Sequence, residues 1–381
     1  MMLSGERFHV DYTLTGGEAE ALAKAKDICL EQTVEFPEDL VPAGFIRDEV
    51  VGRLESFAAD GVGRYFARVS YATETAAGEL TQLLNVVFGN ISIKPGIRVK
   101  SLDLPASLLK SFRGPRFGRD GLRTLLKVPR RPLLQTALKP MGLSAAELAE
   151  VAYKCAVGGI DIIKDDHGLT NQCFAPFAER VERCAAAVDK ANSETGGNSI
   201  YVANVTAAPD EMFRRARLAK AAGAGGLVVA PALTGLDAMR SLADDDGIAL
   251  PVISHPAFQG TYVINSDAGL SHYCLFGQIA RLAGADATIY PNFGGRFSFS
   301  REECESIAAG SAAPMGHIKA IFPSPGGGLS LDNVPELLAV YGQEVIFLMG
   351  GGLFKHSPDL IGNCRHFRTM VVSFADAQPL K

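Results

Sequence analysis

Lysine, aspartate and histidine side chains that can do chemistry follow one apolar run, as Lys164-Asp165-Asp166-His167 after GGIDII. If this run forms a strand, alternation places Lys164 and Asp166 on the same face. A buried lysine loses its charge readily, so it can act as a base or condense with CO2 to a carbamate, an anionic oxygen ligand. With the Asp166 carboxylate, such a group suits Mg²⁺, which prefers oxygen ligands. The alternative, of equal weight, is a structural Lys–Asp ion pair that closes the strand.

Other reactive side chains also stand directly after apolar runs. Lys139 ends LLQTAL and precedes Pro140, which suggests a partner base or an electrostatic clamp; the alternative is a rim lysine that only reaches water. His255 ends PVIS, where we expect an acid, a base or an oxyanion donor rather than a core histidine. Arg296, in YPNFGGRF, offers a planar fork for a phosphate or carboxylate.

Two triple-glycine runs, in PSPGGGL and MGGGL, suggest phosphate binding. Glycine lets backbone N–H groups approach an anion closely, and barrel enzymes frequently bind phosphate in their last two loops. The alternative is turn glycines, which are common between strand and helix. Because the runs fall in two adjacent final loops, we favour phosphate binding and assign it to Gly326, Gly327, Gly351 and Gly352.

The elements that position these residues recur from Pro132 onward as a short apolar strand, a polar turn and an amphipathic helix. Eight parallel strands that close into a (β/α)8 barrel bring all of their carboxyl ends to one rim. An open doubly wound sheet is the rival, but eight uninterrupted units favour closure. The predicted strands are 133–138, 160–164, 200–205, 226–230, 250–254, 287–290, 318–322 and 345–349.

The first part of the chain lacks this regular alternation and predicts a separate, small α+β domain of the ferredoxin-like kind over residues 1–120, with the barrel domain at 121–381. A connector is expected at 112–131, which contains two prolines and many arginines. In the small domain we expect a helix over 18–30 and strands over 7–14, 64–72, 83–93 and 97–105.

Composition excludes several classes of protein. The 381 residues are 47% hydrophobic with a net charge of −5 and no block of lysine or arginine, which argues against a nucleic-acid partner. Seven cysteines are scattered without any CxxC spacing, as expected of buried thiols in a reducing compartment. No apolar stretch approaches the length of a membrane span. We therefore expect a cytoplasmic enzyme without export or membrane insertion.

The segment GGIDIIKDDHGLTNQCFAPF resembles the strand-two signature of the RuBisCO family, in which a carbamylated lysine and two acids hold Mg²⁺. The resemblance extends over nearly the whole chain. It implies that Lys164 is the carbamate and Asp166 a ligand, with His167 at the third ligand position. LLQTALKPMGLS puts Lys139 on the family's proton-shuttling lysine, and PVISHPAF puts His255 on a substrate-binding histidine. The glycine runs fall on the family's two phosphate loops.

The resemblance also implies a partner. Glu31 in EQTVEFP and Asn90 in VVFGNISI stand where the family supplies two active-site residues from a neighbouring subunit. A head-to-tail homodimer with shared active sites is therefore expected.

Departures from the family pattern exclude CO2 fixation. Met141 stands where carboxylating members have a second lysine, and His167 replaces a ligand glutamate. Pro256 replaces an arginine, Tyr290 stands where a histidine is expected, and 291–299 replaces the mobile lysine loop. A base, a metal-polarised carbonyl and one phosphate site remain. The chain thus resembles a RuBisCO-like protein of form IV.

Such a site forms an enediolate on a phosphorylated substrate, with Mg²⁺ on the ketone and Lys139 or His255 moving the proton. Our first expectation is decarboxylation or hydrolytic cleavage of 3-oxo-isoapionate 4-phosphate, because Arg296 offers a carboxylate clamp. The alternative is an isomerase or enolase acting on 5-methylthioribulose 1-phosphate, with aromatic residues near 293–299 as the apolar pocket. A non-catalytic sugar-phosphate sensor is a third hypothesis. His167 leaves open a weaker or imidazole-binding metal, or an acid–base histidine beside an unmodified Lys164.

Overall fold

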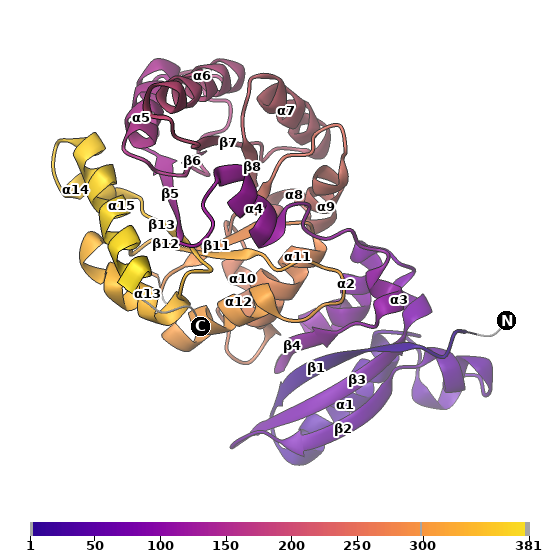
Figure 1. Ribbon diagram of the computed structural model, residues 1–381. Helices are drawn as coiled ribbons and strands as arrows, with labels where there is room; N and C mark the ends of the chain where they lie inside the picture. Colours follow the sequence, from indigo (N-terminus) through magenta and orange to yellow (C-terminus); the bar gives the residue numbers. More distant parts are fainter. Residues whose placement is uncertain (1–2, 298, 378–381) are drawn as a thin grey trace.

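The computed structural model describes residues 3–297 and 299–377 and contains a small sheet domain beside a closed barrel (Figure 1). This architecture confirms the predicted fold class. Among the described residues, no helix is both long enough and apolar enough to cross a membrane.

The small domain is an antiparallel sheet with β1 at its centre, ordered β4-β1-β3-β2, and a short fifth strand, β10, at the β4 edge. Strand β1 buries every second residue, as a half-buried strand should. The element order β1-α1-β2-β3-α2-β4 is the ferredoxin-like one. The strands are β1 Arg7–Thr15, β2 Arg53–Ala59, β3 Arg64–Ala72, β4 Ile97–Asp103 and β10 Gly269–Leu270.

Two sequence predictions in this domain are wrong. Residues 83–93 do not form a strand: helix α2 (Leu80–Phe88) and a 3-10 turn (Asn90–Ile93) occupy them, because Leu80, Leu83 and Val87 bury one helical face. Strand β2 was not predicted, since this edge strand has no fully buried residue and its sequence shows no alternation.

Eight parallel strands close into the barrel in the predicted order. Seven predicted strands lie within two residues of the observed ones. The seventh lies four residues later than predicted, at Phe322–Gly326, because its Pro-Ser-Pro-Gly sequence has little strand propensity. The barrel strands are β5 Leu133–Leu138, β6 Ile162–Asp165, β7 Ile200–Asn204, β8 Gly226–Val229, β9 Val252–Ser254, β11 Ala287–Pro291, β12 Phe322–Gly326 and β13 Ile346–Leu348.

Helices surround the barrel and cover one face of the small sheet (Figure 1). They are α1 Glu18–Glu31, α2 Leu80–Phe88, α3 Ala106–Leu109, α4 Gly118–Leu126, α5 Ala145–Val157, α6 Phe177–Thr195, α7 Pro209–Ala221, α8 Pro231–Thr234, α9 Leu236–Asp244, α10 Gly260–Val263, α11 Ala280–Leu282, α12 Arg301–Ala312, α13 Val334–Tyr341, α14 Gly351–Lys355 and α15 Leu360–Ala377. Short 3-10 or π turns are Glu38–Leu40, Ile46–Val50, Thr73–Ala76, Asn90–Ile93, Tyr273–Ile279 and Leu331–Asn333.

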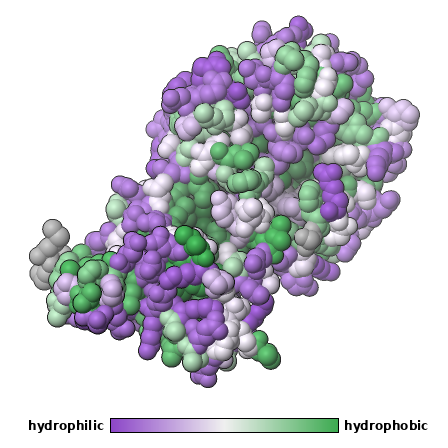
Figure 2. Space-filling view, turned by 180° about the vertical axis from the view of Figure 1, so that it is seen from behind, coloured by the Kyte–Doolittle hydropathy of each residue, from purple (hydrophilic) through white to green (hydrophobic). Residues whose placement is uncertain are grey.

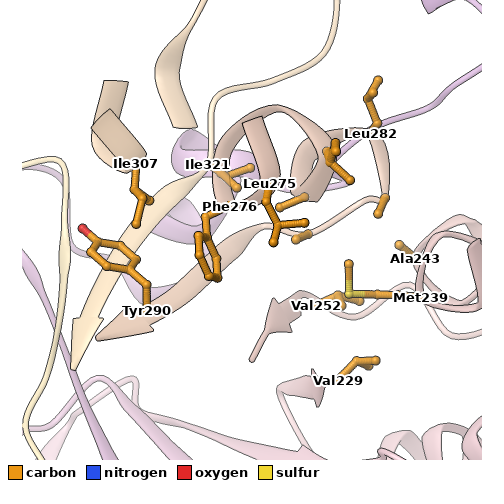
Figure 3. Packing of buried hydrophobic residues seen from close by; sticks show 14 of the residues in the cluster. Val229, Met239, Ala243, Val252, Leu275, Phe276, Leu282, Tyr290, Ile307 and Ile321 are labelled. Atoms are coloured by element: carbon orange, nitrogen blue, oxygen red, sulfur yellow. The ribbon is translucent and has the colours of Figure 1, made fainter. Parts of the chain in front are cut away.

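The barrel has an inner and an outer core. Alternate strand residues such as Ile162 and Phe322 fill the interior, and helix α4 packs Leu122 and Leu126 against them. This helix lies inside the segment predicted to be only a connector. The other strand residues face the helices, where Tyr290 packs beside Phe276 (Figure 3). Because α4 closes the interior at the amino ends of the strands, chemistry is confined to the carboxyl ends.

Candidate active site at the mouth of the barrel

Strand β6 presents Lys164 and Asp166 to the barrel interior, as the alternation predicted. Lys164 is 1% exposed, and its Nζ donates to the backbone oxygen of Asp165 at 2.9 Å. The Asp165 side chain points the other way, behind the barrel, where it accepts from Tyr201 (2.7 Å) and Arg180 (3.2 Å). The Asp166 side chain points into the mouth of the barrel, where its Oδ1 lies 2.9 Å from Nζ of Lys139.

The pKa values of both Lys164 and Asp166 in this cluster are lowered, for different reasons. Burial lowers the pKa of Lys164 to about 8; the Asp166 charge opposes this shift and the Lys139 charge adds to it. Burial alone would raise the pKa of Asp166, but the His167 hydrogen bond and the Lys164 and Lys139 charges outweigh it and hold that pKa well below its usual range. Asp166 is therefore ionised at neutral pH, whereas Lys164 gives up its proton unusually easily.

Two histidines stack beside this cluster. Nδ1 of His167 lies 3.3 Å from Oδ1 of Asp166, and its ring lies 4.4 Å from the His255 ring at 12°. Burial, then the charges of Lys164 and His167, hold the pKa of His255 well below its usual value. Nδ1 of His255 accepts from the backbone N–H of Ala257 at 3.2 Å, which leaves its proton on Nε2. His255 is thus a neutral imidazole with a donor available, while His167 is half exposed.

The loops after β11, β12 and β13 interlock through glycines. A Cβ on Gly295 would stand 2.3 Å from the Gly327 oxygen, and one on Gly352 would stand 2.5 Å from the Leu329 oxygen. Gly327 has a φ of +74°, which favours glycine, whereas Gly326 lies within β12 and packs against Leu348. A Cβ on Gly351 would meet nothing within 4 Å, so this backbone is open to a ligand.

The glycine loops adjoin the charged cluster. A Cβ on Gly350 would lie 4.0 Å from Cε of Lys139, which itself pairs with Asp166. The residues singled out in the sequence therefore form one continuous surface that runs from the glycine loops through Lys139 and Asp166 to the two histidines. This is the convergence that a closed barrel predicts.

Arg296 differs from the residues of that surface, because its side chain is exposed and rests on an aromatic ring. Its guanidinium lies 5.0 Å from the centroid of the Phe297 ring. Phe297 is half exposed, and its ring lies next to Gly327, where it would contact a Cβ on that glycine. Of the other two aromatic residues in this loop, Phe299 packs on His272 and Phe293 on Tyr341, both outside the barrel. One apolar ring, Phe297, therefore stands at the rim beside the glycine loops.

Glu31 and Asn90 lie together on the small domain. Nδ2 of Asn90 donates to Oε1 of Glu31 at 3.0 Å, at the end of α1 and the start of the 3-10 turn that follows α2. Asn90 is exposed and Glu31 is partly exposed, and the two side chains bond to each other rather than to a barrel residue.

The comparisons with known proteins agree with this geometry. The family model "Ribulose bisphosphate carboxylase large chain, catalytic domain" matches residues 119–373. The chain belongs to the RuBisCO large-chain family. It is a RuBisCO-like protein: ribulose bisphosphate carboxylase-like protein 1 of Rhodopseudomonas palustris is 39% identical over 368 residues, which cover 97% of this chain and 98% of that one.

Two further relatives refine the comparison. The protein of Rhodospirillum rubrum named 5-methylthioribulose-1-phosphate isomerase is 38% identical over 352 residues, which cover 92% of each chain. The crystal structure of a RuBisCO-like protein from Rhodopseudomonas palustris superimposes with a TM-score of 0.89 at 37% identity, covering 99% of this chain and 100% of that one.

This RuBisCO-like chain differs from the sequence-based alignment at strand six. Tyr290 faces outward and packs on Phe276, so it does not occupy the expected histidine's place in the mouth (Figure 3). The inward residue is Ile289, which belongs to the barrel interior. The correction follows from strand alternation, and it leaves this side of the mouth apolar.

Sequence reasoning also missed a polar pair inside the barrel of this RuBisCO-like protein. Gln135 is fully buried, and its Oε1 accepts from the Ser324 hydroxyl at 3.0 Å. Its Nε2 has no hydrogen-bond partner among the described residues. Counting back in twos from Lys139 along β5 would have placed Gln135 on the inner face.

Proposed function

We propose that this RuBisCO-like protein is an isomerase or enolase of a phosphorylated, methylthio-bearing keto sugar, of which 5-methylthioribulose 1-phosphate is the first candidate. The observation that carries the proposal is the Lys139–Asp166 pair, 2.9 Å apart, beside buried Lys164 and one interlocked set of glycine loops. This surface provides a base, a position for a polarised ketone and a phosphate cradle.

The chain's own residues suffice for the proton transfers. Lys139, once it has released its proton, removes a proton from the carbon next to the ketone, and the pair of electrons moves to the oxygen to give an enediolate. The Nε2 proton of His255 is available to the developing oxyanion. The former carbonyl carbon then gains a proton while the hydroxyl of the adjacent carbon loses one, which gives the isomeric ketone, so that nothing is oxidised, reduced or cleaved overall.

Several observations favour this substrate over the phosphorylated sugar acid expected first. The proposed carboxylate clamp, Arg296, rests on Phe297, whose ring puts an apolar surface at the rim. Pro256 and inward-facing Ile289 add no positive charge on the histidine side of the mouth for an acid or a second phosphate. The R. rubrum relative carries the isomerase name, and similarity over 92% of both chains supports a related substrate here.

We further propose that a divalent cation, with Mg²⁺ as the first candidate, binds at Lys164 and Asp166. Among the described residues, no group of three histidine, cysteine or acidic side chains could hold a metal. The donor set fits a hard cation only when the Lys164 amine becomes a carbamate, with Asp166 second and His167 third. The low pKa of buried Lys164 supports that modification. A bound cation would polarise the substrate ketone.

The test incubates the protein with Mg²⁺ and bicarbonate and with each candidate substrate in turn. Phosphorus and proton NMR should show 5-methylthioribulose 1-phosphate converted to an isomer without release of CO2. Release of CO2 from 3-oxo-isoapionate 4-phosphate would instead restore the sugar-acid reaction. Saturable binding of either compound without turnover, unchanged by chelator, would show a sensor.

A further inference from the structure

A second cavity lies between the small domain and the barrel. Its volume is about 510 Å³, and it is lined by α2 on one side and by the segments after β8 and β9 on the other. Apolar side chains gather where the small domain meets the barrel (Figure 2). Lys139, Lys164, Asp166, His255 and the glycine runs do not line it, so it is separate from the site described above.

The walls of this cavity carry no charge. They combine apolar side chains with a few neutral polar ones, and lysine, arginine, histidine, aspartate and glutamate are absent from the lining. The lining residues are Leu84, Val87, Phe88, Ser92, Pro231, Ala232, Gly235, Leu236, Gln259, Thr261, Tyr262, Asn265, Ala268, Gly269, Leu270, Leu275 and Ile279. A phosphate or carboxylate would lose its hydration here without gaining a counter-charge.

The side-chain oxygen of one residue in the lining, Gln259, is buried without a hydrogen bond in the described part of the chain. Gln259 is 3% exposed, and its Oε1 has no partner among the described residues. A buried amide without a partner is costly, so native proteins generally satisfy such groups. Two backbone hydrogen bonds hold Gln259 in place. Its backbone N–H donates to the Pro256 oxygen, and its backbone oxygen accepts from the N–H of Tyr262. The backbone of Gln259 is therefore fixed, and the residue lines the wall of an uncharged cavity.

We propose that this cavity binds a neutral, largely apolar small molecule that exchanges a hydrogen bond with the Gln259 amide. Its volume falls within the range of small-molecule sites, and its mostly apolar walls with a few neutral polar groups match their usual composition. Gln259 lies in the turn that follows His255. In this turn the backbone N–H of Ala257 donates to Nδ1 of His255 and so orients its ring. Ligand in the cavity would therefore contact the turn that orients a histidine of the barrel mouth. The proposal does not depend on which sugar phosphate is the substrate.

The test titrates the full-length protein with the neutral fluorophore N-phenyl-1-naphthylamine. We expect saturable binding at one site per chain, displaced by 1-naphthol but not by 1-naphthoate, the same ring system with a charge, nor by inorganic phosphate. The cavity-filling variant Ala232→Trp should weaken binding at least tenfold. The matched control Ala186→Trp, on the exposed face of α6, should bind as the native protein does.

A second variant tests the amide itself. Gln259→Leu keeps the size of the side chain, so it should still bind naphthalene but lose the preference of the native protein for 1-naphthol over naphthalene. Displacement by naphthoate as effective as by naphthol would overturn the proposal, as would native affinity in folded Ala232→Trp. Absence of saturable binding would also overturn it and would show that a second copy or the chain's own motion fills the space.

Discussion

Among single residues, the proposed proton transfer depends most on Lys139. Its amine lies 2.9 Å from Asp166 and its Cε lies beside Gly350, so the proposed base stands between the glycine loops and the carboxylate. Lys139→Ala should lower kcat by about 10²- to 10⁴-fold, the usual contribution of a positioned base. Circular dichroism and Tm should not change, because the side chain is 38% exposed. Lys154→Ala, which removes a surface lysine paired with Glu150, is the control and should keep native kcat; native turnover by Lys139→Ala would remove it from the mechanism.

Lys164 predicts a pH dependence of activation. Its pKa is lowered to about 8 by burial, and only the neutral amine reacts with CO2. At constant dissolved CO2, the rate of activation by CO2 and Mg²⁺ should rise about tenfold from pH 7 to 9, with a midpoint near 8. Carbon-13 NMR of protein treated with labelled CO2 should show a carbamate signal that Lys164→Met lacks. Activation independent of pH, or a carbamate signal retained in the variant, would show that Lys164 stays unmodified.

These residues were accessible from the sequence because each ends a strand. Alternation alone put Lys164 and Asp166 on one face and Asp165 on the other, and the structure confirms it. At strand six the family resemblance put Tyr290 at the expected histidine's place, one residue away from the inward-facing Ile289. The His167–His255 stack was not predictable, since it depends on the distance between two loops rather than on either sequence.

At the scale of elements, the glycines of the last loop have two different roles: one is needed for packing, and the other leaves space for a ligand. A Cβ on Gly352 would meet the Leu329 oxygen at 2.5 Å, so Gly352→Ala should lower the free energy of unfolding by about 1–3 kcal/mol. Gly351→Ala meets nothing within 4 Å and should leave Tm unchanged, yet its methyl group would stand in the way of a phosphate and raise KM. Calorimetry and steady-state kinetics measure both effects. Equal losses of Tm, or an unchanged KM for Gly351→Ala, would reduce both glycines to turn residues.

Element boundaries were predictable where hydrophobic period and element type agreed. Strand β5, LLQTAL, is an apolar run of strand length and matches its prediction. Strand β12 does not match its prediction. Its prolines and glycine are uncommon in strands, so the strand forms only because it closes the barrel, and the prediction fell on the apolar residues before it, such as Ile318 and Ile321. Helix α4 was not predicted, because its segment is rich in arginine and proline. The helix is stabilised by packing Leu122 and Leu126 against the end of the barrel interior, a contact that the sequence does not reveal.

At the scale of the whole molecule, Glu31 and Asn90 predict shared active sites. They pair with each other on the small domain, and the family resemblance assigns them to the neighbour's site. Inactive Glu31→Gln and Lys139→Ala proteins, mixed and allowed to exchange subunits, should regain roughly a quarter of native activity, because half of the dimers are mixed and each has one intact site. Light scattering should show dimers throughout. A fully active monomer, or mixed dimers without recovered activity, would confine the site to one chain.

If this mouth forms an enediolate on a methylthio keto sugar phosphate, as we propose, it must exchange a substrate proton with the solvent. The most direct measurement is proton NMR of 5-methylthioribulose 1-phosphate incubated in D2O with the protein, Mg²⁺ and bicarbonate. We predict that deuterium replaces the proton on the carbon next to the ketone, at a rate abolished in Lys139→Ala. Substrate that binds but keeps that proton throughout would contradict the account.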